Sequence, residues 1–167
     1  MSAGAGHGRG GSGWGWGLAA VLWMALIFCG SLAALSGDHT HRLLDWLARR
    51  LHRAPSFWEE ERINLLLRKA WHLAEYAVLA ALLHAALRRV VPDWGGGRGC
   101  WHRAGIAAAA FALAVLYGQG DEYHQRFVPG RASSVRDVEI DAAGAALGVA
   151  ATLAWRARRR SGEQPPE

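Results

Sequence analysis

The stretch WGWGLAAVLWMALIFCGSLAALS, residues Trp14–Ser36, decides the fold class because it carries no charged residue. A helix rises about 1.5 Å per residue, so this stretch can cross a hydrocarbon core of about 30 Å. It also lacks the polar face that a helix in a soluble bundle would need. The stretch therefore predicts a first transmembrane helix and favours a membrane protein over a soluble helical bundle.

A cleaved signal peptide is the alternative interpretation of this stretch, with Ala33 and Ala34 near a cleavage point. The apolar run is long for a signal peptide, and only Arg9 supplies a basic start. We therefore expect the first span to be retained.

Three further spans are predicted along the 167 residues. Ser56 and Glu59 match a capping box, which marks the start of a helix that runs through Arg89 with its second half in the membrane. The predicted spans after the first are 70–87, 104–118 and 138–155. The fold class is thus all-α, a polytopic membrane bundle of four transmembrane helices. A Gly/Ser-rich tail (1–13) precedes the membrane domain (14–156), and a basic tail (157–167) follows it.

Residues 38–54 place four leucines on one helical face and arginines elsewhere. This pattern is typical of an interfacial amphipathic helix lying on the membrane surface after the first span. A solvated connector is an equally good interpretation.

The net charge of +5 comes from arginine, and Lys69 is the only lysine. The basic residues flank apolar runs and form no single patch, which favours contact with membrane lipids and no nucleic-acid partner. Cys29 and Cys100 form neither a disulfide framework nor a metal-binding spacing. No metal site and no cofactor is predicted.

Basic residues flanking the spans divide almost equally between the two sides of the membrane. Many of those on one side fall in the long 37–69 segment, which can itself be interfacial, so we expect both termini to lie in the cytoplasm. The protein would be a multi-pass protein of the bacterial cytoplasmic (inner) membrane, with the 119–137 loop facing outward.

Two polar stretches carry residues that are costly to bury in a membrane. Lys69, His72 and Tyr76 share one helical face, with Glu75 on its shoulder. The second stretch covers residues 121–141. A charge at the membrane centre costs on the order of 3 kcal/mol, so such groups normally face a partner or a wet cavity. We expect the two stretches to face each other near one membrane surface, with Lys69 and His72 meeting carboxylates of the second stretch.

The candidate polar site comprises Lys69, His72, Glu75, Tyr76, Asp121, Glu122, Gln125, Arg131, Asp137 and Asp141. Arg126 and Arg131 are the candidate anion-binding residues, and no residue is assigned a catalytic role. A structural polar network that holds three helices together explains the same residues almost as well. Ser134 and Asp137 also fit a capping pair, and the four-residue spacing of Gly144 and Gly148 fits close helix packing.

The pattern Lys-x-x-His-x-x-x-Tyr before an apolar span, followed by Asp-Glu-x-x-Gln, Pro-Gly-Arg, Ser, Asp-Val and a small-residue helix, resembles the VanZ-like family over roughly residues 18–155. The matching residues are Lys69, His72, Tyr76, Asp121, Glu122, Gln125, Pro129, Gly130, Arg131, Ser134, Asp137, Gly144 and Gly148. Asp141 departs from the pattern, where Asn is more usual. The resemblance implies a multi-pass membrane protein with a namesake linked to low-level teicoplanin resistance, and it implies no particular reaction.

Three functions are compatible with these residues. The first is binding of an anionic lipid or a lipid-linked cell-wall precursor through basic side chains, with an influence on glycopeptide susceptibility. The second is an intramembrane enzyme, hydrolase-like, with His72 as general base or metal ligand and Asp121 and Glu122 as its partners. The third is a structural membrane subunit that recruits a neighbour through Gly144 and Gly148.

Overall fold

The protein is an all-α bundle of four helices. The computed structural model describes residues 13–31, 50, 56–92, 99–128 and 135–162. The helices within these ranges are α1 (Gly13–Ser31), α3 (Phe57–Val90), α4 (Cys100–Gln125) and α5 (Val135–Ser161). All four are long and apolar enough to cross a membrane. The predicted fold class is therefore confirmed, and the chain is a multi-pass membrane protein.

The longest helix, α3, begins and ends where its sequence predicts. The backbone N–H of Ser56 donates to Glu59 Oε2 at 2.8 Å, which forms part of the capping box. At the other end the backbone N–H of Val91 bonds to the Leu87 carbonyl, and Pro92 cannot continue the helix. The helix expected from Ser56 through Arg89 is thus confirmed.

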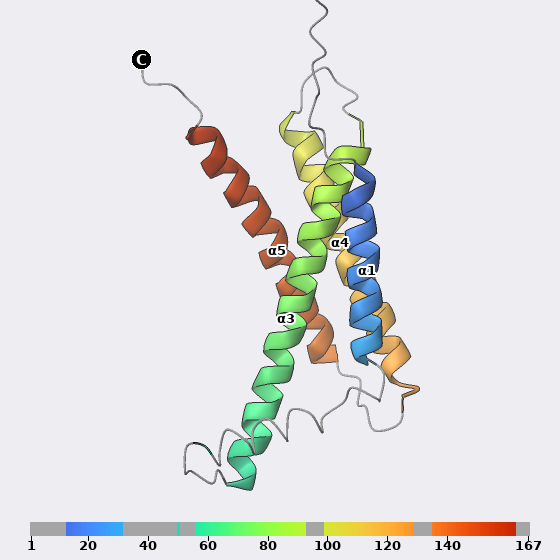
Figure 1. Cartoon of the computed structure of the whole chain (residues 1–167), viewed down its shortest axis with the longest axis vertical. Helices are drawn as coiled ribbons and strands as arrows, with labels where there is room; N and C mark the ends of the chain where they lie inside the picture. The colour runs from blue at the N-terminus through green and yellow to red at the C-terminus, as the bar shows by residue number, and fades with distance from the viewer. Residues whose placement is uncertain (1–12, 32–49, 51–55, 93–98, 129–134, 163–167) are drawn as a thin grey trace, which may run out of the picture.

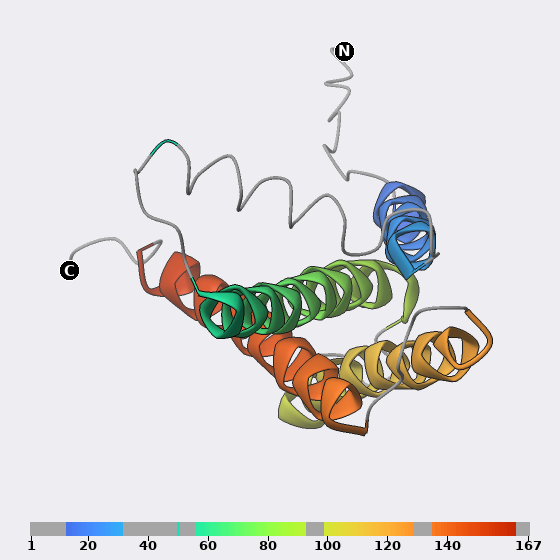
Figure 2. The same ribbon diagram turned by 90° about the horizontal axis from the view of Figure 1, so that it is seen from below.

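Helix α3 is the central element of the bundle. It contacts α1, α4 and α5, and its most extensive interface is with α5. Seen along the bundle, α1 lies on one side of α3, and α4 and α5 lie on the other (Figure 2). The first turns of α3 extend beyond the other helices, and the last turns of α5 diverge from the bundle (Figure 1).

The close approach of α3 and α5 depends on two glycines. A Cβ placed on Gly144 would collide with the backbone carbonyl of Leu73, and one on Gly148 would collide with that of Ala77. Both pairs are spaced by four residues, so the glycines form one small face on which the α3 backbone rests. The packing interpretation of these glycines is confirmed, and α3 already occupies the face that a recruited neighbour would need.

The interior of the bundle is rich in alanine, and many of its large apolar side chains lie on the exterior. The buried core includes Ala80, Ala110, Ala114 and Ala145, whereas leucines and tryptophans along all four helices are exposed. This arrangement suits helices that pack by close backbone approach and present their bulky residues to lipid.

Two helices are longer than predicted. Helix α4 continues seven residues past Gly118, and α5 continues past Trp155 to Ser161. The residues 119–125 look like a polar connection in sequence, yet Asp121, Glu122 and Gln125 are buried against other helices. The interfacial helix predicted at 38–54 lies outside the described residues, apart from Arg50.

Candidate functional site

The predicted polar residues gather at one end of the bundle, where α1 and α4 finish and α5 begins, beside the middle of α3 (Figure 1). We call this the polar end. The opposite end, where α3 finishes, α4 begins and α5 finishes, is called the basic end because arginines crowd there. The buried polar residues of the polar end are Ser31, His72, Asp121, Glu122, Gln125, Asp137 and Asp141. The expectation that the two polar stretches face each other is therefore correct for these residues.

His72, Glu122 and Asp141 form the centre of the site, one from each of α3, α4 and α5. His72 Nδ1 lies 3.1 Å from Asp141 Oδ1, and Asp141 is only 1% exposed. One ligand-capable atom from each of the three residues lies within 4.8 Å of the others. His72 therefore meets Asp141 and Glu122, as the sequence predicts among its alternatives.

Gly118 on α4 makes room for this centre. A Cβ at Gly118 would stand 3.1 Å from Tyr76 Cε1 and 3.2 Å from Asp141 Oδ2. Glu122 follows Gly118 by one helical turn, so both lie on the same face of α4. Asp141 Oδ2 thus points toward the face of α4 that carries Glu122, and Tyr76 lines the same space from α3.

Asp121 belongs to a second, separate network that reaches α1. Ser31 Oγ donates to Asp121 Oδ2 at 2.7 Å, and Gln125 Nε2 donates to the same oxygen at 2.9 Å. The enzyme hypothesis paired Asp121 with His72, but the hydrogen bonds of Asp121 run to α1 and to its own helix. Sequence reasoning missed Ser31, although a hydroxyl at the end of an otherwise apolar helix was a visible signal.

Glu75 faces α1 rather than the centre of the site. Its Oε1 accepts a hydrogen bond from Trp71 Nε1 at 2.6 Å, and its backbone carbonyl accepts one from Trp23 Nε1 at 2.9 Å. Glu75 therefore bonds to Trp71 of its own helix and to Trp23 of α1 instead of joining the central cluster. The two tryptophans were not predicted to take part.

Asp137 is held by an arginine of α3. Arg68 Nη2 donates to Asp137 Oδ2 at 2.7 Å, with the Arg68 side chain 44% exposed and the carboxylate buried. The predicted capping partner, Ser134, lies outside the described residues. Sequence reasoning missed Arg68, which precedes the Lys69 motif by one residue.

The remaining predicted cations surround the polar end less closely. Lys69 is half-buried on α3. Arg126 is exposed at the end of α4, with its guanidinium carbon 5.9 Å from the centroid of the Tyr123 ring. Arg131 lies outside the described residues.

Among the described residues, the buried oxygens at the polar end that find no hydrogen-bond partner include Asp121 Oδ1, Asp141 Oδ2 and the Tyr76 hydroxyl. Two of them, Asp141 Oδ2 and the Tyr76 hydroxyl, belong to residues that line the space beside Gly118. Buried polar atoms are normally satisfied, so this space is the place where an additional group would fit best.

Two other histidines, His84 and His124, make contacts with neighbouring helices. His84 Nδ1 lies 2.9 Å from Thr152 Oγ1 on α5, and the His124 ring packs at 4.8 Å against that of Phe28. Neither takes part in the central cluster.

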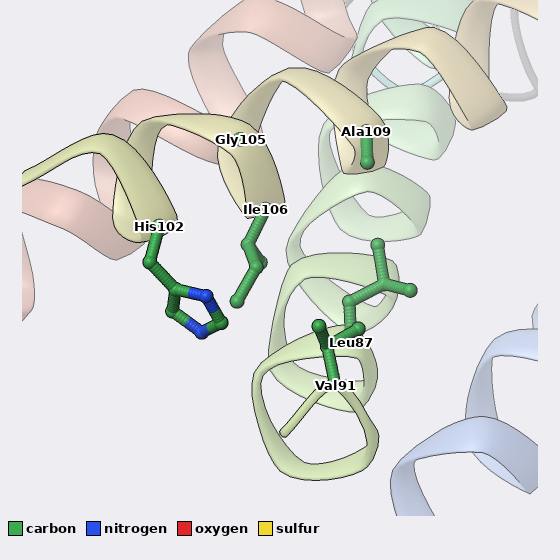
Figure 3. A pocket seen from close by; sticks show the side chains of 6 residues that line it. All are labelled: Leu87, Val91, His102, Gly105, Ile106 and Ala109. Atoms are coloured by element: carbon green, nitrogen blue, oxygen red, sulfur yellow. The ribbon is translucent and has the colours of Figure 1, made fainter. Parts of the chain in front are cut away.

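A pocket of about 230 Å³ lies at the basic end, between the last turn of α3 and the first turns of α4. Figure 3 shows Leu87 and Val91 on one side of it and His102 and Ile106 on the other. Its lining is apolar apart from His102, and it is remote from the polar cluster.

The central arrangement supports two kinds of chemistry. A buried imidazole oriented by a carboxylate is a general base in many sites. A histidine with two carboxylates also offers a set of donors for a divalent cation.

Comparison with known proteins gives a family but no close relative. No curated protein and no solved structure matches the chain significantly. The family model described as VanZ/LLP1 matches residues 16–156. The matched region holds most of α1, all of α3 and α4, most of α5 and every residue of the candidate site, and so the chain belongs to the VanZ/LLP1 family.

Proposed function

We propose that this protein binds the anionic headgroup of a membrane lipid or of a lipid-linked cell-envelope precursor at the polar end of the bundle. The shared chemistry of the two ligands is a phosphate or pyrophosphate group on an apolar chain. The apolar chain of the lipid would contact the exposed leucines and tryptophans of the protein. The headgroup would contact the cations around the buried carboxylates.

The observation that carries this proposal is the position of Arg68. Asp137 holds one guanidinium nitrogen at 2.7 Å, while 44% of the side chain stays exposed. A guanidinium has five N–H donors, so a guanidinium fixed in this way retains donors for a phosphate. Lys69 follows it on α3, and the exposed Arg136 lies on α5 beside Asp137.

The proposal includes an orientation. The polar end would face outward from the bacterial cytoplasmic membrane, with both termini in the cytoplasm, because lipid-linked cell-wall precursors are displayed on that side. A protein bound to such a precursor would change how readily a glycopeptide reaches the precursor. This would link the protein to glycopeptide susceptibility. The hydrolase-like alternative stays a prediction.

Binding to purified protein tests the proposal. Native mass spectrometry or quenching of tryptophan fluorescence would measure binding of an anionic phospholipid and of a polyprenyl pyrophosphate in separate arms. We expect Arg68→Gln to weaken binding by about tenfold or more, because a charge-assisted hydrogen bond contributes roughly 1.5–3 kcal/mol.

The matched control is Arg159→Gln. Arg159 is exposed on α5 at the basic end, where its guanidinium lies 4.7 Å from the Trp155 ring centroid. Equal weakening by both substitutions would indicate a general charge effect and contradict a site at the polar end. Preference for one of the two ligands would identify the source of the headgroup.

A further inference from the structure

One buried carboxylate between α3, α4 and α5 is only partly satisfied. Asp141 is 1% exposed and receives one contact, from His72 Nδ1 to Oδ1 at 3.1 Å. Its second oxygen has no hydrogen-bond partner within the described part of the chain, although it is completely buried. Glu122 brings a second buried carboxylate to the same place from α4. A buried carboxylate is stable only when a positive charge or a sufficient set of donors accompanies it.

We infer that His72, Glu122 and Asp141 bind a divalent transition-metal cation such as Zn²⁺ or Mn²⁺. The geometry of the three side chains carries this inference. Ligand atoms on one Zn²⁺ ion stand about 3.4 Å apart at bond lengths of 2.0–2.2 Å. The corresponding atoms here lie within 4.8 Å of one another, so modest adjustment of the three side chains would bring them to that spacing.

The identity of the donors selects the class of cation. An imidazole nitrogen suits Zn²⁺ and other first-row transition metals, and carboxylate oxygens suit Mn²⁺ as well as harder cations. Three protein ligands leave a further coordination position, as in catalytic zinc sites. Gly118 and the Tyr76 ring line the space next to Asp141 Oδ2.

Gly118 is the residue that keeps this space open. Because a Cβ there would stand 3.2 Å from Asp141 Oδ2, Gly118→Ala pushes on the oxygen that we assign to the cation. The three ligands come from three helices, so the cation also joins α3, α4 and α5 at the polar end.

Metal analysis of the full-length protein tests the inference. Protein purified in detergent and stripped with a chelator would be dialysed against Zn²⁺ or Mn²⁺, and bound metal would be measured by mass spectrometry. We expect about one ion per chain, and an affinity lowered more than about tenfold in His72→Gln, Glu122→Gln and Asp141→Asn. Gly118→Ala should weaken binding in the same direction.

Two control variants replace a histidine and a glutamate outside the proposed metal site. His84→Gln removes a buried histidine of the same helix that bonds to Thr152, and Glu139→Gln removes an exposed carboxylate of α5 next to the site in sequence. Both should bind metal as the unsubstituted protein does. Thermal unfolding with and without metal provides a second measurement, because a bound ion raises the unfolding temperature only where the site is intact.

The inference is overturned if the unsubstituted protein retains no stoichiometric metal ion. Protons would then neutralise the buried carboxylates. It is equally overturned if the three ligand variants bind metal like the controls. Neither result depends on lipid binding, so failure of the metal site and failure of the headgroup site at Arg68 are distinguishable.

Discussion

Two buried aspartates at the polar end differ in how their oxygens are satisfied. Asp121 Oδ2 accepts from both Ser31 and Gln125, whereas Asp141 receives only the His72 contact. Both lie in membrane-spanning helices, where an unsatisfied group costs more than it would at a protein surface. At the scale of single residues, Asp121 therefore serves helix association through Oδ2. Each aspartate keeps one oxygen without a hydrogen-bond partner among the described residues, but that of Asp141 lies beside Gly118 and the central cluster.

Asp121→Ala should destabilise the protein by about 1–3 kcal/mol, because it removes the acceptor that the Ser31 hydroxyl and the Gln125 amide share. Each donor then keeps only a longer bond, from Ser31 Oγ to the Ile27 carbonyl at 3.1 Å and from Gln125 Nε2 to Ser31 Oγ at 3.2 Å. Thermal unfolding in detergent, followed by the helical circular dichroism signal, would measure the loss. The double variant with Ser31→Ala should lose less than the sum of the two single losses, since both remove the same bond. Strict additivity would contradict the 2.7 Å bond.

The sequence identifies the polar residues more readily than their partners. The cost of burying charge singles out His72 and the carboxylates of residues 121–141, and the structure brings most of them together. The sequence does not indicate that Asp121 pairs with Ser31 rather than with His72, because the pairing depends on how α1 is rotated against α4. Arg68 was missed for a similar reason, since its partner Asp137 lies 69 residues away along the chain.

At the scale of helices, the α3–α5 crossing depends on the absence of two side chains. Gly148→Ala should weaken the bundle markedly, because the new Cβ would collide with the backbone carbonyl of Ala77, which cannot rotate away. Unfolding in detergent would show the loss as a lower transition temperature.

The control for this variant is Gly105→Ala on α4. A Cβ at Gly105 meets nothing within 4 Å, and alanine favours a helix by up to about 1 kcal/mol over glycine. Gly105→Ala should therefore be neutral or stabilising. Equal destabilisation by the two substitutions would contradict a specific contact at Gly148.

Composition and capping residues predict the presence of the helices, but they do not predict the lengths of the helices. The start of α3 is marked by Ser56 and Glu59, and its end by Pro92. The last turns of α4 contain Asp121, Glu122 and Gln125, which a hydropathy argument assigns to a loop. They are helical and buried, with Asp121 and Gln125 bonded to Ser31 of α1 and Glu122 lying near His72 and Asp141. Such neighbours are not visible in a local stretch of sequence.

At the scale of the whole molecule, the four spans place the N-terminus of α1 and the C-terminus of α5 on one side of the membrane. Cys100, at the basic end, is exposed and makes no disulfide. In a Cys29→Ser background, a membrane-impermeant maleimide should leave Cys100 unlabelled in intact cells and label it after permeabilisation. This result is expected if the basic end faces the cytoplasm, as the proposed orientation requires.

The reciprocal variant completes the topology experiment. Arg136→Cys, in a background without Cys29 and Cys100, places a thiol at the polar end and should react in intact cells. Labelling of Cys100 together with protection of position 136 would reverse the proposed orientation, and the headgroup site would then face the cytoplasm.

The connections of α1 also bear on how the protein is made. Trp23 bonds to a carbonyl 52 residues later, Ser31 to a carboxylate 90 residues later, and Tyr117 returns to Met24 across 93 residues. At a synthesis rate of about 5–20 residues per second, α1 waits roughly 5–18 s for its α4 partners to leave the ribosome. A charged residue in α1 would spend that interval unpaired in the lipid. Helix α1 carries no charged residue, so it can lie in the bilayer before the ionisable residues of α3 and α4 arrive to bond with it.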